Sequence, residues 1–165
     1  EIQRGEGNEK ALAECEGVEV LERQTANWSR AEAQSLMENW LTSHGSDIKG
    51  VIAQNDEMAL GAIEAIKAAG MDVSDFAIAG VDGVTDALNA VKRGEMDSIL
   101  QDATGQAQGA IDVAIKAVMP DYEPQSPLWE DYPELDWADG GETLYQVPWT
   151  PVTMDNVDEL LAERQ

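Results

Sequence analysis

Short apolar runs alternate along this chain with longer segments of helical periodicity. Runs 48–53, 76–80 and 98–101 are apolar without a regular polar alternation, which is typical of strands covered on both faces. The segments between them, one ending at Gly70 and one spanning 85–93, have helical spacing and are closed by glycine. This order predicts an α/β fold: a three-layer parallel sheet with helices on both faces.

Further elements flank this central part. We expect a strand at 18–23, an extended segment at 144–153, and helices at 2–14, 29–44, 104–119 and 154–163. The helix at 29–44 opens with the capping-box pattern Ser29-Arg30-Ala31-Glu32. Residues 120–142 are rich in proline, tryptophan and acids without a sustained period, so we expect a long loop there.

The charge of the chain excludes one class of partner. Ten Lys and Arg stand against 33 Asp and Glu, giving a net charge of −23. Nucleic acid and anionic membranes are therefore unfavourable partners. The acids are dispersed among periodic apolar residues, which favours a solvated acidic surface. Such a surface resembles that of proteins from salt-loving organisms, where salt screens the repulsion, and we expect stability to rise with salt.

Polar or aromatic residues follow four of the predicted strands. They are Asn27-Trp28, Asn55-Asp56, Asp82-Gly83 and Gln101-Asp102. In an open parallel sheet, ligands bind at the carboxyl ends of the strands. Amides, carboxylates and a flat indole together suit a neutral polyhydroxyl compound such as a sugar. Taken singly, Asn55 and Asp56 also fit helix caps, and Asp82 also fits a turn before glycine.

Catalysis and metal binding find weaker support. His44, the single histidine, stands at a predicted helix end beside a glycine, where a capping role is favoured. Asp136, Asp139 and Glu142 lack the spacing of an EF-hand loop. The glycines form neither a P-loop nor a dinucleotide fingerprint. We therefore expect no enzyme activity, no cofactor and no metal.

Several stretches resemble a known family, the ribose-binding-protein-like sugar receptors of ABC importers, periplasmic binding protein type I. The stretches are AQNDEMALGA at 53–62, RGEG at 4–7, AGVDG at 79–83, AVKRG at 90–94 and VTMDNV at 152–157. The resemblance covers nearly all of the chain outside residues 120–143. It implies a receptor that captures a monosaccharide or polyol in a cleft between two lobes and delivers it to a membrane permease.

The resemblance also assigns ligand-binding residues. It implies that Arg4 donates to sugar hydroxyls, that Trp28 stacks on the sugar ring, and that Asn55 and Asp82 hold hydroxyls. Gln101 is expected at the pocket edge. We expect Asp56 and Glu57 to serve the helix amino terminus, where negative charge is favoured.

In that family pattern, residues 1–101 correspond to the carboxy-terminal lobe without its first strand. Residues 102–146 belong to the other lobe and include the Pro- and Trp-rich acidic insertion, while 147–165 form a crossing strand and the terminal helix. The resemblance implies an extracytoplasmic location, and any signal segment would precede this fragment. Two alternatives stay open: the effector-binding domain of a LacI-type transcription repressor, and a sugar-processing enzyme.

Overall fold

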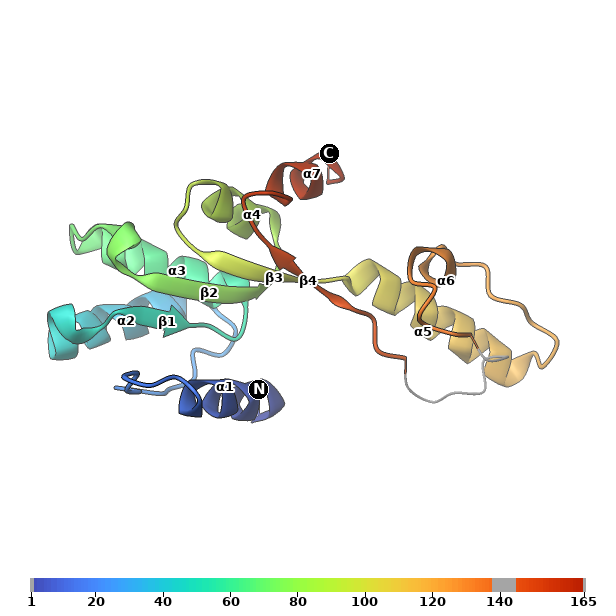
Figure 1. Ribbon diagram of the computed structural model, residues 1–165, viewed down its shortest axis with the longest axis horizontal. Coiled ribbons are helices and arrows are strands. Elements are labelled where there is room, and N and C mark those ends of the chain that lie inside the picture. The colour runs from blue at the N-terminus through green and yellow to red at the C-terminus, as the bar shows by residue number, and fades with distance from the viewer. Residues whose placement is uncertain (1, 138–144, 165) are drawn as a thin grey trace. The chain divides into compact units, whose positions relative to one another are not determined.

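The computed structural model describes residues 2–137 and 145–164 (Figure 1). The chain forms two compact units. The first comprises Glu1–Leu100 and Pro151–Gln165, and the second comprises Gln101–Thr150. Each unit is described by itself below.

A parallel arrangement of strands organises the first unit. The sheet has the order β1-β2-β3-β4, with bounds β1 Gly50–Ile52, β2 Ala77–Asp82, β3 Asp97–Gln101 and β4 Trp149–Val152. Strands β1 and β2 pair in parallel, as do β2 and β3. The strands that the apolar runs predict are therefore confirmed, and so is the α/β class.

The helices lie close to their expected bounds. In the first unit they are α1 Ile2–Ala13, α2 Arg30–His44, α3 Asp56–Ala68, α4 Thr85–Lys92 and α7 Val157–Ala162, with 3-10 turns at Gly45–Asp47 and Val73–Asp75. The predicted cap at Ser29 is present, since its side chain accepts a hydrogen bond from the backbone N–H of Glu32. Gly70 and Gly94, with φ of 72° and 71°, follow α3 and α4 in the left-handed conformation that favours glycine.

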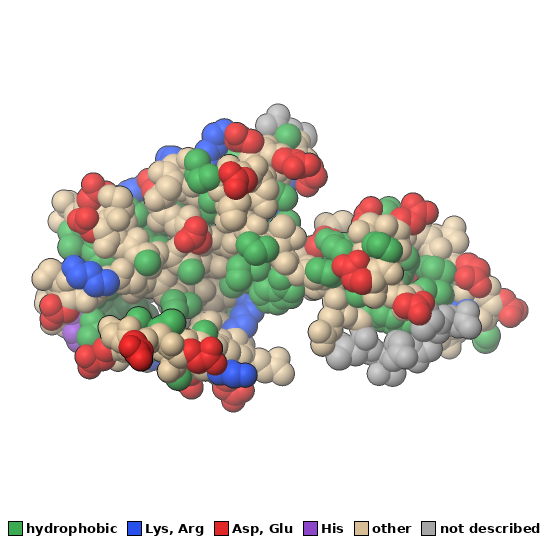
Figure 2. Space-filling view, viewed as in Figure 1, with side chains coloured by type: hydrophobic (Ala, Val, Ile, Leu, Met, Phe, Trp, Pro, Cys, Tyr) green, Lys and Arg blue, Asp and Glu red, His purple; other side chains and the backbone are tan. Residues whose placement is uncertain are grey.

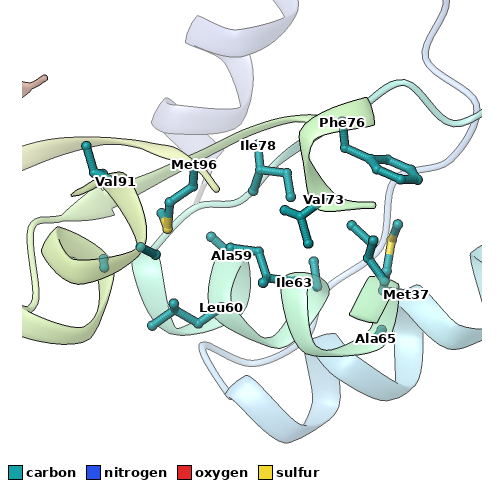
Figure 3. Close-up of a cluster of buried hydrophobic side chains, with 14 of the residues drawn as sticks. Met37, Ala59, Leu60, Ile63, Ala65, Val73, Phe76, Ile78, Val91 and Met96 are labelled. Carbon is teal, nitrogen blue, oxygen red and sulfur yellow. The ribbon is translucent and has the colours of Figure 1, made fainter. Parts of the chain in front are cut away.

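The core of the first unit lies between β2 and the helix pair α2 and α3. Figure 3 shows side chains of α3, such as Ala59 and Ile63, pointing toward Ile78 of β2, with Met37 of α2 beside them. Ala59 is 0% exposed and Met37 1% exposed. Helices α2 and α3 approach closely at Gly61, where a Cβ atom would lie 2.2 Å from the carbonyl oxygen of Arg30.

One face of the sheet is less well covered than the other. Ile78, on the face toward α3, is 3% exposed, whereas Ile52 of β1 and Ile99 of β3 are 50% and 38% exposed. Strand β1 is also an edge strand among the residues that the structure describes. Apolar surface therefore remains open on this unit.

Arg30 connects three helices of the first unit. Its guanidinium group contacts Glu57 of α3 at 2.9 Å and Asp86 of α4 at 3.0 Å, and lies 3.7 Å from Glu64 of α3. The residue itself begins α2. A single cation thus holds the start of α2 against both neighbouring helices.

The strand predicted at 18–23 is wrong. These residues form no strand or helix, and Val18 and Val20 are 55% and 57% exposed. A strand needs a neighbour whose backbone groups complete its hydrogen-bond ladder, and no such neighbour pairs with 18–23 within the described chain. The segment is tied to α1 instead through an ion pair between Arg23 and Glu9.

The second unit is built on α5 Ala103–Val118, with the short helix α6 Leu128–Asp131 packed against it. Much of the predicted loop is irregular as expected, although α6 interrupts it and residues 138–144 lie outside the described range. Leu128, which is 2% exposed, fits over the glycines of α5: a Cβ atom at Gly109 would come within 2.5 Å of it. Trp129 packs edge-on against Trp137 and Tyr145.

The charged side chains are dispersed. Figure 2 shows Asp and Glu side chains scattered over the visible face of each unit rather than gathered in one patch. In the described parts of the chain, no helix has the length and apolarity needed to cross a membrane.

Candidate functional site

Arg4 and Trp28 meet at one edge of the first unit. Arg4 lies on the first turn of α1 and donates from Nη1 to the carbonyl oxygen of Gln54 at 2.6 Å, at the end of the segment that follows β1. Its Cζ atom lies 5.8 Å from the centroid of the Trp28 ring, a cation–π distance. The guanidinium group therefore links α1 to the loop before α2 and to the loop before α3.

The loop that carries Trp28 has an unusual backbone. Asn27 and Trp28 are consecutive residues with φ of 49° and 62°. Non-glycine residues rarely adopt this left-handed conformation, and it clusters at functional positions. Trp28 keeps 45% of its surface exposed, so part of this large aromatic side chain remains open to solvent.

Asn55 caps a helix with one atom of its side-chain amide and keeps the other for a different partner. It is the N-cap of α3, where its Oδ1 atom accepts from the backbone N–H of Met58 at 3.0 Å, and the residue is 8% exposed. The helix cap that the sequence allows at Asn55 is therefore confirmed. Because the cap uses Oδ1, the Nδ2 group is the part of this side chain with which a ligand oxygen would bond.

Asp82 is the last residue of β2 and has a φ of 116°, outside the usual range for a non-glycine residue. Burial raises the pKa of its carboxyl group, while nearby Arg4 lowers it and nearby Asp56 raises it. The residue thus combines backbone strain with a perturbed acid beside a cation. Both features are typical of binding and catalytic sites.

Asp56 lies in the first turn of α3, as expected, and it has a second role that the sequence does not show. It does not serve the helix terminus alone: its Oδ1 accepts from Ser98 Oγ at 2.7 Å and its Oδ2 from Val84 N at 2.9 Å. It is 0% exposed, and burial raises the pKa of its carboxyl group despite these hydrogen bonds. Asp56 therefore fastens the turn after β2, and with it Asp82, to β3 and α3.

A glycine makes room for this buried acid. A Cβ atom at Gly80 would lie 2.4 Å from Asp56 Oδ1 and 2.9 Å from Met96 Cε. Glycine inside a strand marks a close approach of this kind, so Gly80 was the signal in the sequence that pointed to a buried neighbour. Glu57, by contrast, faces Arg30 as an ion-pair partner in addition to lying at the helix start.

Gln101 ends β3 and is the first residue of the second unit. Its Nε2 donates to Oε1 of Gln106 at 3.1 Å. The structure thus brings Arg4, Trp28, Asn55 and Asp82 to one edge of the first unit, whereas the described contact of Gln101 lies within the second.

The groups at this edge differ in their bonding capacity. The edge offers a guanidinium donor, a carboxylate acceptor, an amide and an indole face. In residues 2–137 and 145–164, no cluster of three or more His, Cys, Asp or Glu is arranged to hold a metal ion. Two of the three acids that were compared with an EF-hand calcium loop, Asp139 and Glu142, lie outside the described residues.

Known proteins resemble this chain in sequence. A putative rhizopine-binding protein of Rhizobium meliloti is 50% identical over 107 residues, which are 64% of this chain and 34% of that protein. A xylitol-binding protein of Mycolicibacterium smegmatis is 45% identical over 115 residues, 69% of this chain and 32% of that protein. The chain thus spans about a third of the length of these curated relatives.

A solved structure shares the fold. An ABC transporter solute binding protein from Bacillus halodurans with bound myo-inositol has a TM-score of 0.76 and 38% sequence identity, over 98% of this chain and 50% of that one. The family model described as "Periplasmic binding protein domain" matches residues 1–119. The chain therefore belongs to the periplasmic binding protein domain family.

Proposed function

We propose that this chain is part of the solute-binding component of a sugar ABC importer. The full-length receptor captures a monosaccharide or polyol in a cleft between two lobes and delivers it to a membrane permease. It acts outside the cytoplasmic membrane, and it makes and breaks no bond in its ligand.

The observation that carries this proposal is the joint placement of Arg4, Trp28 and Asp82. A cation 5.8 Å above a half-exposed indole, beside a carboxylate, provides donors, acceptors and a stacking face at one place. Such a set matches the hydroxyl belt and the apolar faces of a sugar ring. The rhizopine- and xylitol-binding relatives and the inositol-bound structure support the same ligand class.

In this proposal Arg4 donates to hydroxyl oxygens and Asp82 accepts from hydroxyl groups. Asn55 contributes its Nδ2 group, because its Oδ1 atom caps α3. Trp28 stacks on the ring, and Gln101 reaches the ligand from the end of β3. Neutral hydroxyls lose their water on binding, so each unmatched partner in the site costs about 1–3 kcal/mol.

We also propose a division of the chain between two lobes. Residues 1–101 form most of the carboxy-terminal lobe, 102–146 belong to the other lobe, and 147–165 form a crossing strand and the terminal helix. The open edge of β1 and the exposed Ile52 support a further strand of the receptor beside β1. The exposed Ile111 and Val118 of α5 support a further partner for that helix.

The test is calorimetric titration of the full-length protein with pentoses, hexoses, inositols and pentitols. We expect saturable binding of at least one of them. Asp82→Ala should then weaken binding by about tenfold or more, since it leaves hydroxyl groups unmatched. Asp97→Ala is the matched control, because Asp97 is an exposed aspartate at the opposite end of β3.

Two results would overturn the proposal. One is the absence of binding across the whole panel by a protein that unfolds cooperatively. The other is an Asp82→Ala variant with the affinity of the wild type.

A further inference from the structure

The turn after β2 holds Asp82 in a backbone conformation that its residue type disfavours. Asp82 and Gly83 have consecutive positive φ angles of 116° and 65°. Such a conformation is costly for a residue other than glycine, and it persists only where the surrounding structure fixes it. The contacts that fix this turn therefore also decide where the carboxylate of Asp82 lies.

One peptide group of this turn is held at both of its edges. The carbonyl group of Gly83 and the N–H group of Val84 belong to the same planar peptide unit. The N–H group donates to Oδ2 of Asp56 at 2.9 Å, and the carbonyl oxygen accepts from Nη1 of Arg164. Turning this peptide plane would therefore break two hydrogen bonds to charged side chains, which are stronger than those between neutral groups.

Arg164 reaches the turn from the carboxyl end of α7, an element that is itself well anchored. Helix α7 packs against α4 (Figure 1), and Lys92 of α4 forms an ion pair with Asp158 of α7 at 2.5 Å. Val157, the first residue of α7, is 1% exposed. The packing of α7 thus brings the guanidinium group to the turn, although Arg164 is itself exposed.

The charge of Arg164 also supports the other edge of the peptide. Burial raises the pKa of the Asp56 carboxyl group, and Arg164 is among the groups that lower it. The cation therefore favours the ionised form of Asp56, which is the better acceptor for the N–H group of Val84. Arg164 acts on the turn in two ways: directly at the carbonyl oxygen, and through the charge of Asp56.

We propose that Arg164 is a positioning residue of the sugar site: it fixes the peptide between Gly83 and Val84, and thereby holds the Asp82 carboxylate where it meets sugar hydroxyl groups. This inference rests on the proposed function. All residues of the arrangement belong to the first unit. Arg164 acts through the turn and is not a ligand contact. The proposal gives the end of the terminal helix a role in binding that the sequence does not indicate.

The first measurement needs no ligand. In the full-length protein, Arg164→Met keeps a long unbranched side chain and removes the donor. We expect hydrogen exchange of the Val84 amide, followed by NMR, to become about tenfold faster or more. Lys92→Met is the matched control: it removes one positive charge and an ion pair between α4 and α7, but it leaves the hydrogen bond to Gly83 in place. Exchange at Val84 should be unchanged in this control.

The second measurement is a double-mutant cycle on sugar affinity. We expect Arg164→Met to weaken binding by about threefold or more in the wild-type background, and to add nothing in an Asp82→Ala background. Arg164→Lys keeps a cationic donor for the carbonyl oxygen and should restore most of the affinity. Lys92→Met should bind sugar as the wild type does. This pattern separates positioning from the loss of a charge and from a looser α7.

The outcomes are distinguishable. If the wild type binds no sugar in the panel, the proposed function fails, and the role of Arg164 in binding fails with it. If sugar binds but Arg164→Met leaves either the affinity or the exchange of Val84 unchanged, the proposed function stands and the positioning role is overturned. Equal loss of affinity with and without Asp82 overturns that role as well.

Discussion

Each unit contains a buried aspartate, and the surroundings shift the carboxyl pKa of the two residues in opposite directions. Asp56 is 0% exposed and Asp112 3% exposed. Asp56 accepts from one hydroxyl and from backbone N–H groups of the turn after β2, and burial raises the pKa of its carboxyl group. Burial acts in the same direction on Asp112, yet hydrogen bonds from Ser126, Tyr122 and Trp129 hold its pKa well below the ordinary value. The donors around a carboxylate, not its burial alone, decide its charge.

The largest expected effect is that of Asp112→Asn. The carboxylate accepts from an indole N–H and from the backbone N–H groups of Gln125 and Ser126, none of which can reverse its direction. The amide of asparagine would place its own N–H group against one of these N–H donors, and neither group could accept a hydrogen bond from the other. We expect the free energy of unfolding to fall by about 2–3 kcal/mol, measured by urea unfolding with tryptophan fluorescence.

The pH dependence of that loss provides a check. Because the pKa of Asp112 is lowered by folding, its contribution to stability is present above the ordinary value of 3.8 and is lost as pH falls below it. The gap between wild type and variant should therefore close in acid. A gap that is independent of pH would contradict the picture of a charged Asp112. Asp121→Asn, at an exposed residue nearby, serves as the control.

Gly80→Ala should rank second. The new Cβ atom would lie 2.4 Å from Asp56 Oδ1 and 2.9 Å from Met96, so both neighbours must shift. We expect a loss of about 1–3 kcal/mol in the free energy of unfolding. Gly7→Ala is the counterpart on α1, where a Cβ atom meets nothing within 4 Å, and it should be neutral or stabilising. Equal effects at the two positions would argue against the close approach.

The smallest expected effect is that of Asp56→Asn. An amide can accept from Val84 N and donate to Ser98 Oγ, because a hydroxyl group reverses its role. Unfolding at neutral pH should therefore change by less than about 1 kcal/mol. A loss as large as that of Asp112→Asn would break the comparison.

The sign of the pH effect is opposite at this aspartate. Folding raises the pKa of Asp56, so its stabilising contribution is present below 3.8 and is lost as pH rises through the folded-state value. Relative to Asp56→Asn, the wild type should lose stability over that range as pH rises. Urea unfolding of both proteins across the acidic range measures this.

Local patterns predicted most of the fold because the deciding contacts are close in sequence. The caps at Ser29 and Asn55, and the glycines after α3 and α4, act within one helical turn. The strand at 18–23 failed because strand formation depends on a partner. The packing of Leu128 on α5 could not be predicted for a related reason. It depends on glycines about twenty residues earlier, and the spacing of those glycines also fits an ordinary helix.

The candidate site divides in the same way. Asn55 and Asp82 could be placed at one edge because the parallel strands β1 and β2 end there, whereas Trp28 follows the segment 18–23, which forms no strand. The contacts of Asp56 could not be predicted: Gly80 signals a close neighbour without naming it, and Ser98, which bonds to Asp56, is 42 residues away from it. Arg164 is likewise 81 residues from Gly83.

The contacts of Arg30 set a rule for redesigning this chain. With 33 acids and ten Lys and Arg, lowering the net charge is an obvious way to adapt the protein to dilute buffer. The carboxylates of Glu57, Glu64 and Asp86 are poor targets, since they share one cation that joins α2, α3 and α4. Exposed acids in the segment after α1, such as Glu16 and Glu19, are better targets, because neutralising them lowers the charge repulsion without removing a contact between helices.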